Sequence, residues 1–352
     1  MPQDLEPLVD PRALERYLRE RLPEVAASAG GAGPIEIERH LAGHSNETFF
    51  VRVGGRRFVL RRPPRGAFLP TAHDVGREYR VLSALAETSV RAPRPILMCD
   101  DVSVIGAPFY LMERVEGAVI RNALPDGFEE DIGCRQGIGE ELVDALVELH
   151  AVDWRAVGLD GFGKPAGYLE RQLRRWTGQL ALTEPLTRPL DDLHRVGRWL
   201  EEHIPPGGEV TVVHGDYKLD NAAYRRDPPA RLVAILDWEM STLGDPLADV
   251  GWMLSFWRDS TDPRTSILDD QTVTTLEGFQ PREDLRARYE ARSGRRTGDL
   301  AFYMALAVWK LAILLEGSYA RHLAGVTDDP FFAGLEAGVP ALAAMALSLT
   351  RQ

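Results

Sequence analysis

The sequence contains little cysteine and almost no lysine. Its 352 residues include two cysteines, Cys99 and Cys134, too few for a disulfide framework or a cysteine metal cluster, which is typical of a reducing compartment. Lysine accounts for three of the 41 basic residues, so arginine carries nearly all of the positive charge. A lysine in a candidate site is therefore conspicuous, although high-GC codon usage also explains an excess of arginine.

An excess of positive charge and long apolar runs are also missing. The formal net charge of −12 argues against nonspecific binding to nucleic acid. The most apolar stretch, residues 301–315, carries Lys310 and is shorter than a membrane span, so we expect a buried core helix there. The first ten residues are acidic and lack the apolar segment of a signal peptide. These features predict a cytoplasmic protein that binds neither a membrane nor nucleic acid.

Apolar residues make up 44% of the chain, enough for a real core in each of two lobes. Hydrophobic periodicity predicts an N-terminal helix over 11–21, a helix over 73–86, and strands over 35–41, 48–53, 57–61, 92–101 and 109–115. The remainder is mainly helical. We therefore predict an α+β, bilobal fold, with a small antiparallel lobe over 1–115 (net charge +1) and a larger helical lobe over 116–352 (net charge −13).

The stretch 210–245 concentrates polar side chains at the ends of two short, apolar strands. Asp216 is suited to accept a proton, while Asn221 and Asp237 form a pair of hard oxygen ligands of the kind that Mg²⁺ prefers. The spacing H-x-D-x-x-x-x-N from His214 to Asn221, followed by a strand-borne aspartate, is the catalytic-loop arrangement of kinases. The alternative, ordinary turn residues, explains each of them singly but not the whole spacing.

Two motifs, HGDYKLDN and LDWEMSTLGDPLADVGW, resemble those of the aminoglycoside phosphotransferase superfamily, small-molecule kinases with a protein-kinase-like fold. The segment LHAVDWRAVGLDGFGKPAGYLERQLRRW is similar to the branch found as kinase-like domains of certain acyl-CoA dehydrogenases. The resemblance covers residues 35–315. It implies ATP as phosphoryl donor, Mg²⁺ as cofactor and a small hydroxylated molecule as acceptor.

The resemblance also implies nucleotide-binding positions in the first lobe. Ser45 and Asn46 lie in the turn that covers the phosphates in such folds, although one Gly and two polar residues also fit a plain hairpin. The segment from Glu113 to Val115 corresponds to the hinge whose backbone groups bind adenine. An ordinary strand end is the alternative there.

Arg61 stands where the kinase pattern has the strand lysine that holds the α- and β-phosphates, and Glu78 is placed to pair with it. Arginine departs from the general pattern, and a planar guanidinium is not interchangeable with an ammonium. The adjacent Arg62 leaves the register open by one residue. Neighbouring strand residues face opposite sides of a sheet, so only one of the two arginines can face the nucleotide. We expect it to be Arg61. The alternative is that both arginines are solvated charges.

In the second lobe the resemblance assigns one role to each polar residue of the loop. Asp216 orients the acceptor hydroxyl and accepts its proton. Lys218 lies where the related D-x-K-x-x-N loop places a lysine on the transferring phosphoryl group. His214 is expected to brace the loop through hydrogen bonds, and Asp249 to anchor the catalytic segments without binding metal.

The branch resemblance implies a hydroxylated acyl metabolite, such as a hydroxyacyl-CoA, as acceptor. The arginine-rich segment 171–175 suits the phosphates of CoA, but it fits a solvated helix face equally well. The alternatives are an antibiotic kinase attracting a polycationic aminoglycoside, a non-catalytic nucleotide or acyl-CoA binder, and a metal-dependent phosphohydrolase. Intact Asp216, Asn221 and Asp237 argue against a pure binder. The sequence does not predict an oligomeric state.

Overall fold

A computed structural model describes residues 8–26, 34–40, 46–64, 74–262, 273–326 and 330–351. The predicted phosphate-covering residue Ser45 lies outside these ranges. The chain divides into two compact units, Met1–Glu116 and Gly117–Gln352.

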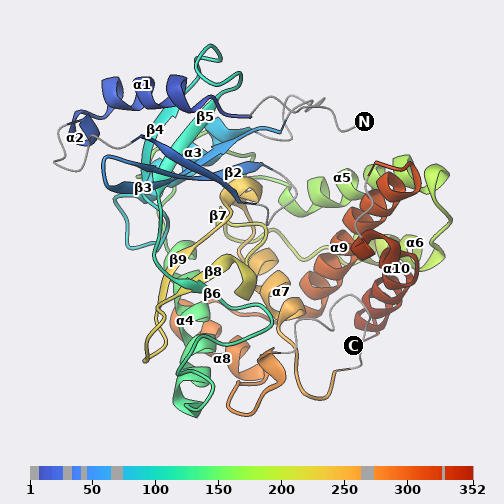
Figure 1. The fold of residues 1–352 in the computed structure, drawn as a ribbon. Helices are drawn as coiled ribbons and strands as arrows, with labels where there is room; N and C mark the ends of the chain where they lie inside the picture. The colour runs from blue at the N-terminus through green and yellow to red at the C-terminus, as the bar shows by residue number, and fades with distance from the viewer. Residues whose placement is uncertain are drawn as a thin grey trace. The chain divides into compact units, whose positions relative to one another are not determined.

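The first unit is built on the five-stranded antiparallel sheet that the sequence predicts (Figure 1). Its strands, in the order β1-β2-β3-β5-β4, are β1 (Glu36–His40), β2 (Glu47–Val53), β3 (Arg56–Arg62), β5 (Phe109–Glu113) and β4 (Pro95–Cys99). Gly54 and Gly55 join β2 to β3 with φ angles of 57° and 74°. A type I′ hairpin turn requires positive φ at both central residues, which explains the Gly-Gly pair.

Three helices accompany this sheet: α1 (Pro11–Arg21), α2 (Pro23–Ala26) and α3 (Val75–Leu85). Tyr17 of α1 packs edge-on against Phe109 of β5, with ring centroids 5.8 Å apart. Tyr79 of α3 packs against Tyr110, the next residue of the same strand, at 6.0 Å. Because successive strand residues point to opposite faces, α1 and α3 cover opposite faces of the sheet.

The second unit is mainly helical, as predicted (Figure 1). Its α-helices are α4 (Ile132–His150), α5 (Tyr168–Thr183), α6 (Asp191–Glu202), α7 (Leu247–Phe256), α8 (Arg282–Ser293), α9 (Leu300–Leu323) and α10 (Pro330–Leu349). Short 3₁₀ turns are η1 (Glu184–Leu186), η2 (Leu219–Asn221), η3 (Trp238–Met240) and η4 (Val273–Thr275). The sequence located the central turns of the α-helices correctly and their ends less well.

Two small antiparallel sheets hold the loops of the second unit. One has the order β6-β8-β9, formed by β6 (Ala118–Val119), β8 (Ala222–Tyr224) and β9 (Leu232–Ile235). The other pairs β7 (Thr211–Val213) with β10 (Thr242–Gly244). The sequence predicts β7, β8 and β9. It does not reveal β6 and β10.

Helix α9 is the central helix of the second unit's core. It packs against α5, α6, α7 and α10, and Trp309 and Ala312 on it are fully buried. By length and composition alone, α9 and residues 331–349 are each long and apolar enough to cross a membrane, and 61% of the α9 window is buried inside the protein. The expected core helix is confirmed, whereas the expectation that it is too short for a span is wrong.

Candidate functional site

The loop after β7 is braced by His214, whose side chain is fully buried. The imidazole lies 2.9 Å from the Leu236 carbonyl oxygen through Nε2 and 3.3 Å from the Asp216 backbone nitrogen through Nδ1. Donation by Nε2–H and acceptance at Nδ1 satisfy both contacts with a neutral ring. Both ring nitrogens are thus engaged by the backbone, which is the bracing arrangement expected from the sequence.

Asp249 of α7 is buried and anchors the same loop through its carboxylate. Its carboxylate accepts the backbone N–H of His214 at 2.7 Å and of Gly215 at 2.8 Å. His150 Nε2 lies 3.4 Å from the carboxylate, and His150 Nδ1 lies 2.8 Å from the Tyr289 hydroxyl. Burial alone would raise the pKa of Asp249, but the interactions with His150 and the Gly215 N–H leave it below its ordinary value. The carboxylate therefore stays charged and serves the loop backbone.

Two residues of the site have a left-handed backbone. Gly215 has φ 84°, and a Cβ there would lie 2.6 Å from the Met240 carbonyl oxygen, so only glycine fits. Asp237 has φ 65° and is the one non-glycine residue with positive φ in the described part of the chain. Such a conformation costs about 1–3 kcal/mol and is concentrated at functional sites, which marks Asp237 as more than a strand end.

The carboxylate of Asp216 is held by donors from separate elements. Its Oδ1 accepts the indole N–H of Trp252 at 2.8 Å, and its Oδ2 accepts the amide N–H of Asn221 at 2.8 Å. Lys218 Nζ lies 3.3 Å from Oδ1, and the Asp216 side chain is 23% exposed. The carboxylate is therefore fixed in orientation while it remains accessible.

Asn221 presents its amide oxygen because its amide nitrogen is occupied. Nδ2 donates to both the backbone carbonyl and Oδ2 of Asp216, each at 2.8 Å. The Leu236 N–H donates to the Asn221 carbonyl at 2.7 Å, which ties Asn221 to the strand end that carries Asp237. Among the described residues, no group of three or more His, Cys, Asp and Glu side chains is placed to hold a metal ion. An Asn–Asp oxygen pair fits Mg²⁺, which completes its coordination with water and phosphate oxygens.

Trp252 and Phe256 are site residues that the sequence reasoning missed. Phe256 lies beneath Lys218, with Nζ 4.8 Å from the ring centroid. Together with Asp249 they stand at spacings of three and four residues on α7, which places them on one helix face. That spacing is visible in the sequence. If Asp249 is taken as the anchor of the loop, this spacing shows that Trp252 and Phe256 lie on the same face of α7, directed at the loop.

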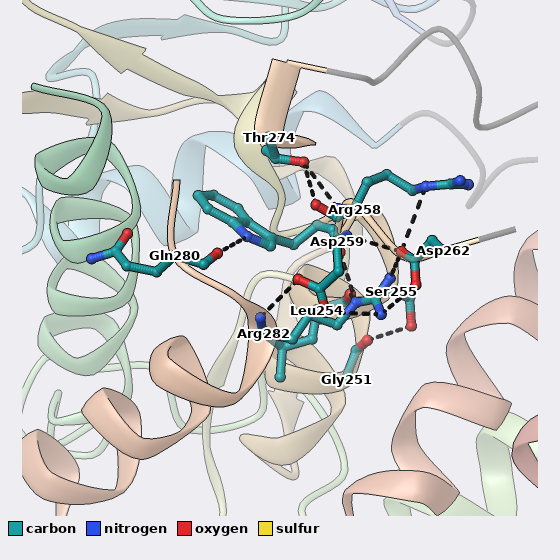
Figure 2. A network of polar contacts seen from close by, with 10 residues as sticks. Gly251, Leu254, Ser255, Arg258, Asp259, Asp262, Thr274, Gln280 and Arg282 are labelled. Carbon is teal, nitrogen blue, oxygen red and sulfur yellow. Dashed lines mark hydrogen bonds and ion pairs between the residues drawn. The ribbon is translucent and has the colours of Figure 1, made fainter. Parts of the chain in front are cut away.

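A polar network fixes the C-terminal end of α7 (Figure 2). The Arg282 side chain donates to the carbonyl groups of Leu254 at 2.9 Å and Trp257 at 2.7 Å. It also pairs with Asp262 at 2.9 Å, and its backbone N–H donates to Asp259 at 3.0 Å. The helix that carries Trp252 is therefore held both at the loop and at its end.

A pocket adjoins the loop within the second unit. It is lined by Tyr168 and Trp176 of α5, Trp252 of α7 and Lys310 of α9, and it reaches Gly215. The sequence singled out Lys310 as a rare lysine in the most apolar stretch but assigned it no role.

In the first unit, Arg61 and Arg62 have separate partners. Arg61 Nη1 donates to Glu78 Oε1 at 2.5 Å, and the two residues are 7% and 1% exposed. Arg62 donates instead to the carbonyl oxygens of Leu8 and Ile105, at 3.0 Å to Ile105. The expected pair of Arg61 with Glu78 is present. The alternative that both arginines are solvated is wrong, because the sheet and its helices enclose them.

The remaining predicted nucleotide residues lie at strand ends. Asn46 is buried just before β2. Glu113 is exposed and ends β5 two residues earlier than predicted, so Val115 lies beyond the strand. The backbone N–H of Glu113 donates to the Arg94 carbonyl at 2.8 Å.

Comparison with known proteins agrees with this arrangement. Residues 36–296 match the sequence model of the phosphotransferase enzyme family. Mouse acyl-CoA dehydrogenase family member 10 is 38% identical over 315 residues, which cover 89% of this chain and 28% of that protein. The chain spans between 28% and 43% of the length of the curated relatives it matches.

Solved structures share the fold over nearly the whole chain. A Ralstonia eutropha protein described as a candidate aminoglycoside phosphotransferase is 34% identical, with a TM-score of 0.78 over 97% of this chain and 98% of that one. Spectinomycin phosphotransferase, solved with ADP and spectinomycin, is 11% identical, with a TM-score of 0.59 over 97% and 99%.

The fold and the loop thus define a kinase-like phosphotransferase. The chain belongs to the phosphotransferase enzyme family. The predicted similarity to the branch associated with acyl-CoA dehydrogenases is also confirmed.

Proposed function

We propose that this protein transfers the γ-phosphoryl group of ATP to a hydroxyl group of a small molecule. The observation that carries the proposal is the set of hydrogen bonds around Asp216 in a chain of a phosphotransferase family. Trp252 and Asn221 each fix one carboxylate oxygen while the side chain remains accessible. A carboxylate held in this way is suited to orient an acceptor hydroxyl and accept its proton.

In the proposed step, the acceptor oxygen forms a bond to the γ-phosphorus, and the bond from that phosphorus to the β–γ bridging oxygen breaks. ADP leaves with the bridging oxygen, and the hydroxyl proton passes to Asp216. Lys218, which lies 3.3 Å from Asp216 Oδ1, would offset negative charge on the transferring group. Catalysis in this template is mainly positioning and charge stabilisation, which these two residues supply.

Asn221 and Asp237 are the residues that would hold Mg²⁺. The amide oxygen of Asn221 is turned away from Asp216 by the two bonds of its nitrogen, and Asp237 keeps a costly backbone conformation at its strand end. When bound, Mg²⁺ would neutralise charge on the phosphates. Both ligands are hard oxygens, as that ion requires.

We assign nucleotide binding in the first unit to Arg61, with Glu78 holding its guanidinium. A buried Arg–Glu pair at 2.5 Å fixes the fork, and a fixed fork is suited to phosphate oxygens. The Glu113 carbonyl and the Val115 backbone would bind adenine. Asn46, and Ser45 in the turn before it, would cover the phosphates. The ADP complex of spectinomycin phosphotransferase supports the use of an adenine nucleotide.

We propose a hydroxyacyl-CoA as the acceptor in preference to an aminoglycoside. Relatives that are 38% and 36% identical are named as acyl-CoA dehydrogenase family members, and this chain matches a part of each. Arg174 and Arg175 on α5 are exposed near Trp176, which lines the pocket. Arginine binds phosphate groups well, and CoA carries several. An aminoglycoside would bring several positive charges to the same surface.

A side-by-side transfer assay tests the proposed function. The protein would be incubated with Mg²⁺ and γ-labelled ATP, and with either hydroxyacyl-CoA thioesters or kanamycin-type compounds, and labelled product would be quantified. We expect label in the thioesters. Label in the aminoglycosides alone would overturn the acceptor and leave the kinase assignment, whereas label in inorganic phosphate alone would identify a phosphohydrolase.

The role of Asp216 is tested by replacement. Asp216→Ala should lower transfer by about 10²–10⁴-fold, the usual contribution of a general base, with ATP binding retained. Single-turnover transfer and equilibrium nucleotide binding measure the two effects separately. Wild-type transfer by Asp216→Ala would remove Asp216 from the reaction.

A further inference from the structure

Helix α9 brings one ammonium group to the loop of the candidate base. Lys310 Nζ donates to the carbonyl oxygen of Gly215 at 2.9 Å, and Gly215 directly precedes Asp216. Within the described part of the chain, no Asp or Glu oxygen lies within 4.0 Å of Nζ. The ammonium is therefore placed in the core of the second unit without a carboxylate in direct contact.

Aromatic rings flank this ammonium. Lys310 Nζ lies 4.2 Å from the ring centroid of Trp252 and 5.8 Å from that of Trp176. The Trp252 indole also donates to Asp216 Oδ1 at 2.8 Å. The ammonium and the indole thus both line the pocket, and the indole connects this wall to the candidate base through its hydrogen bond.

Keeping a lysine here is costly. Burial lowers the pKa of Lys310 to about 8, although Asp216 and Asp249 act in the opposite direction. The loop does not need this ammonium for its own position, because Asp249 already holds the backbone N–H groups of His214 and Gly215. A lysine ammonium has three N–H donors, and Gly215 accepts one of them. The others are available to a molecule in the pocket.

We infer that Lys310 binds the acceptor, donating to the carbonyl or carboxylate oxygen of its acyl group while the acceptor hydroxyl reaches Asp216. This inference rests on the proposed kinase function and specifies the acceptor as a hydroxy acid or its thioester. Trp176 and Trp252 would contact the carbon chain between the two oxygens. A polycationic acceptor is disfavoured at this position, because its amines would be repelled by the ammonium.

A cycle that combines one enzyme change with one substrate change tests the inference. Lys310→Met removes the ammonium and keeps the length of the side chain. The acceptor would be 3-hydroxybutyryl-CoA, or its thioether analogue in which CH₂ replaces the carbonyl. Equilibrium binding would be measured to full-length protein carrying Asp216→Ala, with and without Lys310→Met, in the presence of Mg²⁺ and a non-hydrolysable ATP analogue. Free 3-hydroxybutyrate would distinguish a carboxylate from a thioester.

With Lys310 present, removing the carbonyl should weaken binding by about 10- to 100-fold, the value of a hydrogen bond to a charged group. With Lys310→Met the same substrate change should have little effect. Equal losses in both proteins would overturn the inference, since Lys310 and the carbonyl would then act independently. Failure of both 3-hydroxybutyryl-CoA and free 3-hydroxybutyrate to bind would overturn it as well.

Turnover by otherwise unmodified protein adds a second readout. Lys310→Met should raise KM for the acyl acceptor and leave KM for ATP unchanged, and Lys310→Arg should restore part of the acceptor affinity. Lys164→Met removes an exposed lysine and is the matched control. If the thioester is phosphorylated but the effects of Lys310→Met and of removing the carbonyl are additive, the inference about Lys310 is refuted and the kinase function stands. Absence of transfer to any acceptor would refute the proposed kinase function instead.

The acceptor KM should also depend on pH. The charged or titratable groups that face Lys310 are Asp216, Lys218, Asp249, Arg175, Tyr168 and Tyr303. As pH rises through about 8, Lys310 loses its proton and the acceptor KM should rise. This rise should be absent in Lys310→Met. A rise that persists in that variant would assign the titration to another group and contradict the inference.

Discussion

Replacement of Asp249 separates an anchor from a metal ligand. Its carboxylate is fully buried and accepts two loop N–H groups, from His214 at 2.7 Å and from Gly215 at 2.8 Å. A third contact, from His150, is longer at 3.4 Å. Asp249→Ala removes all three contacts, whereas Asp249→Asn keeps one oxygen acceptor and loses the charge. The two variants therefore remove different numbers of contacts from the loop, and their effects on stability can be compared.

The expected loss in free energy of unfolding follows from the number of N–H donors that lose their acceptor. A buried donor without an acceptor costs about 1–3 kcal/mol, so two stranded N–H groups in Asp249→Ala should lower the free energy of unfolding by about 2–6 kcal/mol. Asp249→Asn retains an acceptor for one of them and should lose about half as much. A domain is stable by about 5–15 kcal/mol, so the alanine variant approaches the limit of folding.

Urea denaturation followed by tryptophan fluorescence measures the stability, and calorimetry measures MgATP binding by Asp249→Asn. We expect a lower urea midpoint and an MgATP affinity close to that of the wild type. The matched comparison is Asp237→Asn, for which we expect the reverse. If Asp249→Asn keeps the wild-type midpoint and loses Mg²⁺-dependent ATP binding, Asp249 is a metal ligand and the anchoring argument fails.

Three further predictions concern other groups. Asp237→Ala should weaken MgATP binding and lower the urea midpoint only slightly, because alanine tolerates a positive φ less well than aspartate; a lower midpoint with unchanged MgATP affinity would contradict its role. Arg61→Lys should raise KM for ATP because an ammonium cannot reproduce the guanidinium fork, whereas Arg62→Lys, the matched control, should lower the melting temperature only. Burial lowers the pKa of His150. Below pH of about 6.5 the unfolded chain therefore binds a proton that the folded chain excludes. The free energy of unfolding should fall by up to about 1.4 kcal/mol for each unit by which the pH is lowered. His150→Gln should remove that slope, which urea titrations at pH 7.5 and 5.5 would show.

Local patterns in the sequence were sufficient for the long helices and strands of the fold, but not for short strands such as β6 and β10. The helix Pro11–Arg21 was predicted with its observed bounds, because apolar residues recur at helical spacing between a proline start and a glycine-rich stop. Gly54 and Gly55 join β2 to β3, and their positive φ angles are those that a tight hairpin turn requires. Neighbouring residues of β3 were expected to face opposite sides, and Arg61 and Arg62 have separate partners, whereas the expectation that Arg61 faces the nucleotide stays a prediction.

Contacts between distant parts of the chain were not predictable in the same way. Trp252 donates to Asp216 across 36 residues, and Lys310 donates to Gly215 across 95 residues. Periodicity shows which face of a helix is buried, but it does not show which loop that face meets. The pocket wall therefore could not be assembled from the sequence, because its residues come from α5, α7, α9 and the loop after β7.

Lys310 shows how far such reasoning extends. A charged group cannot be buried in an apolar helix without hydrogen-bond partners, so Lys310 requires a polar neighbour, although the sequence assigned it none. The structure supplies that neighbour as the Gly215 carbonyl, and the aromatic rings of Trp176 and Trp252 as its surroundings. Neither provides a negative charge in direct contact. The same physical rule that requires a partner within the chain therefore points to a second partner, an oxygen of the acceptor.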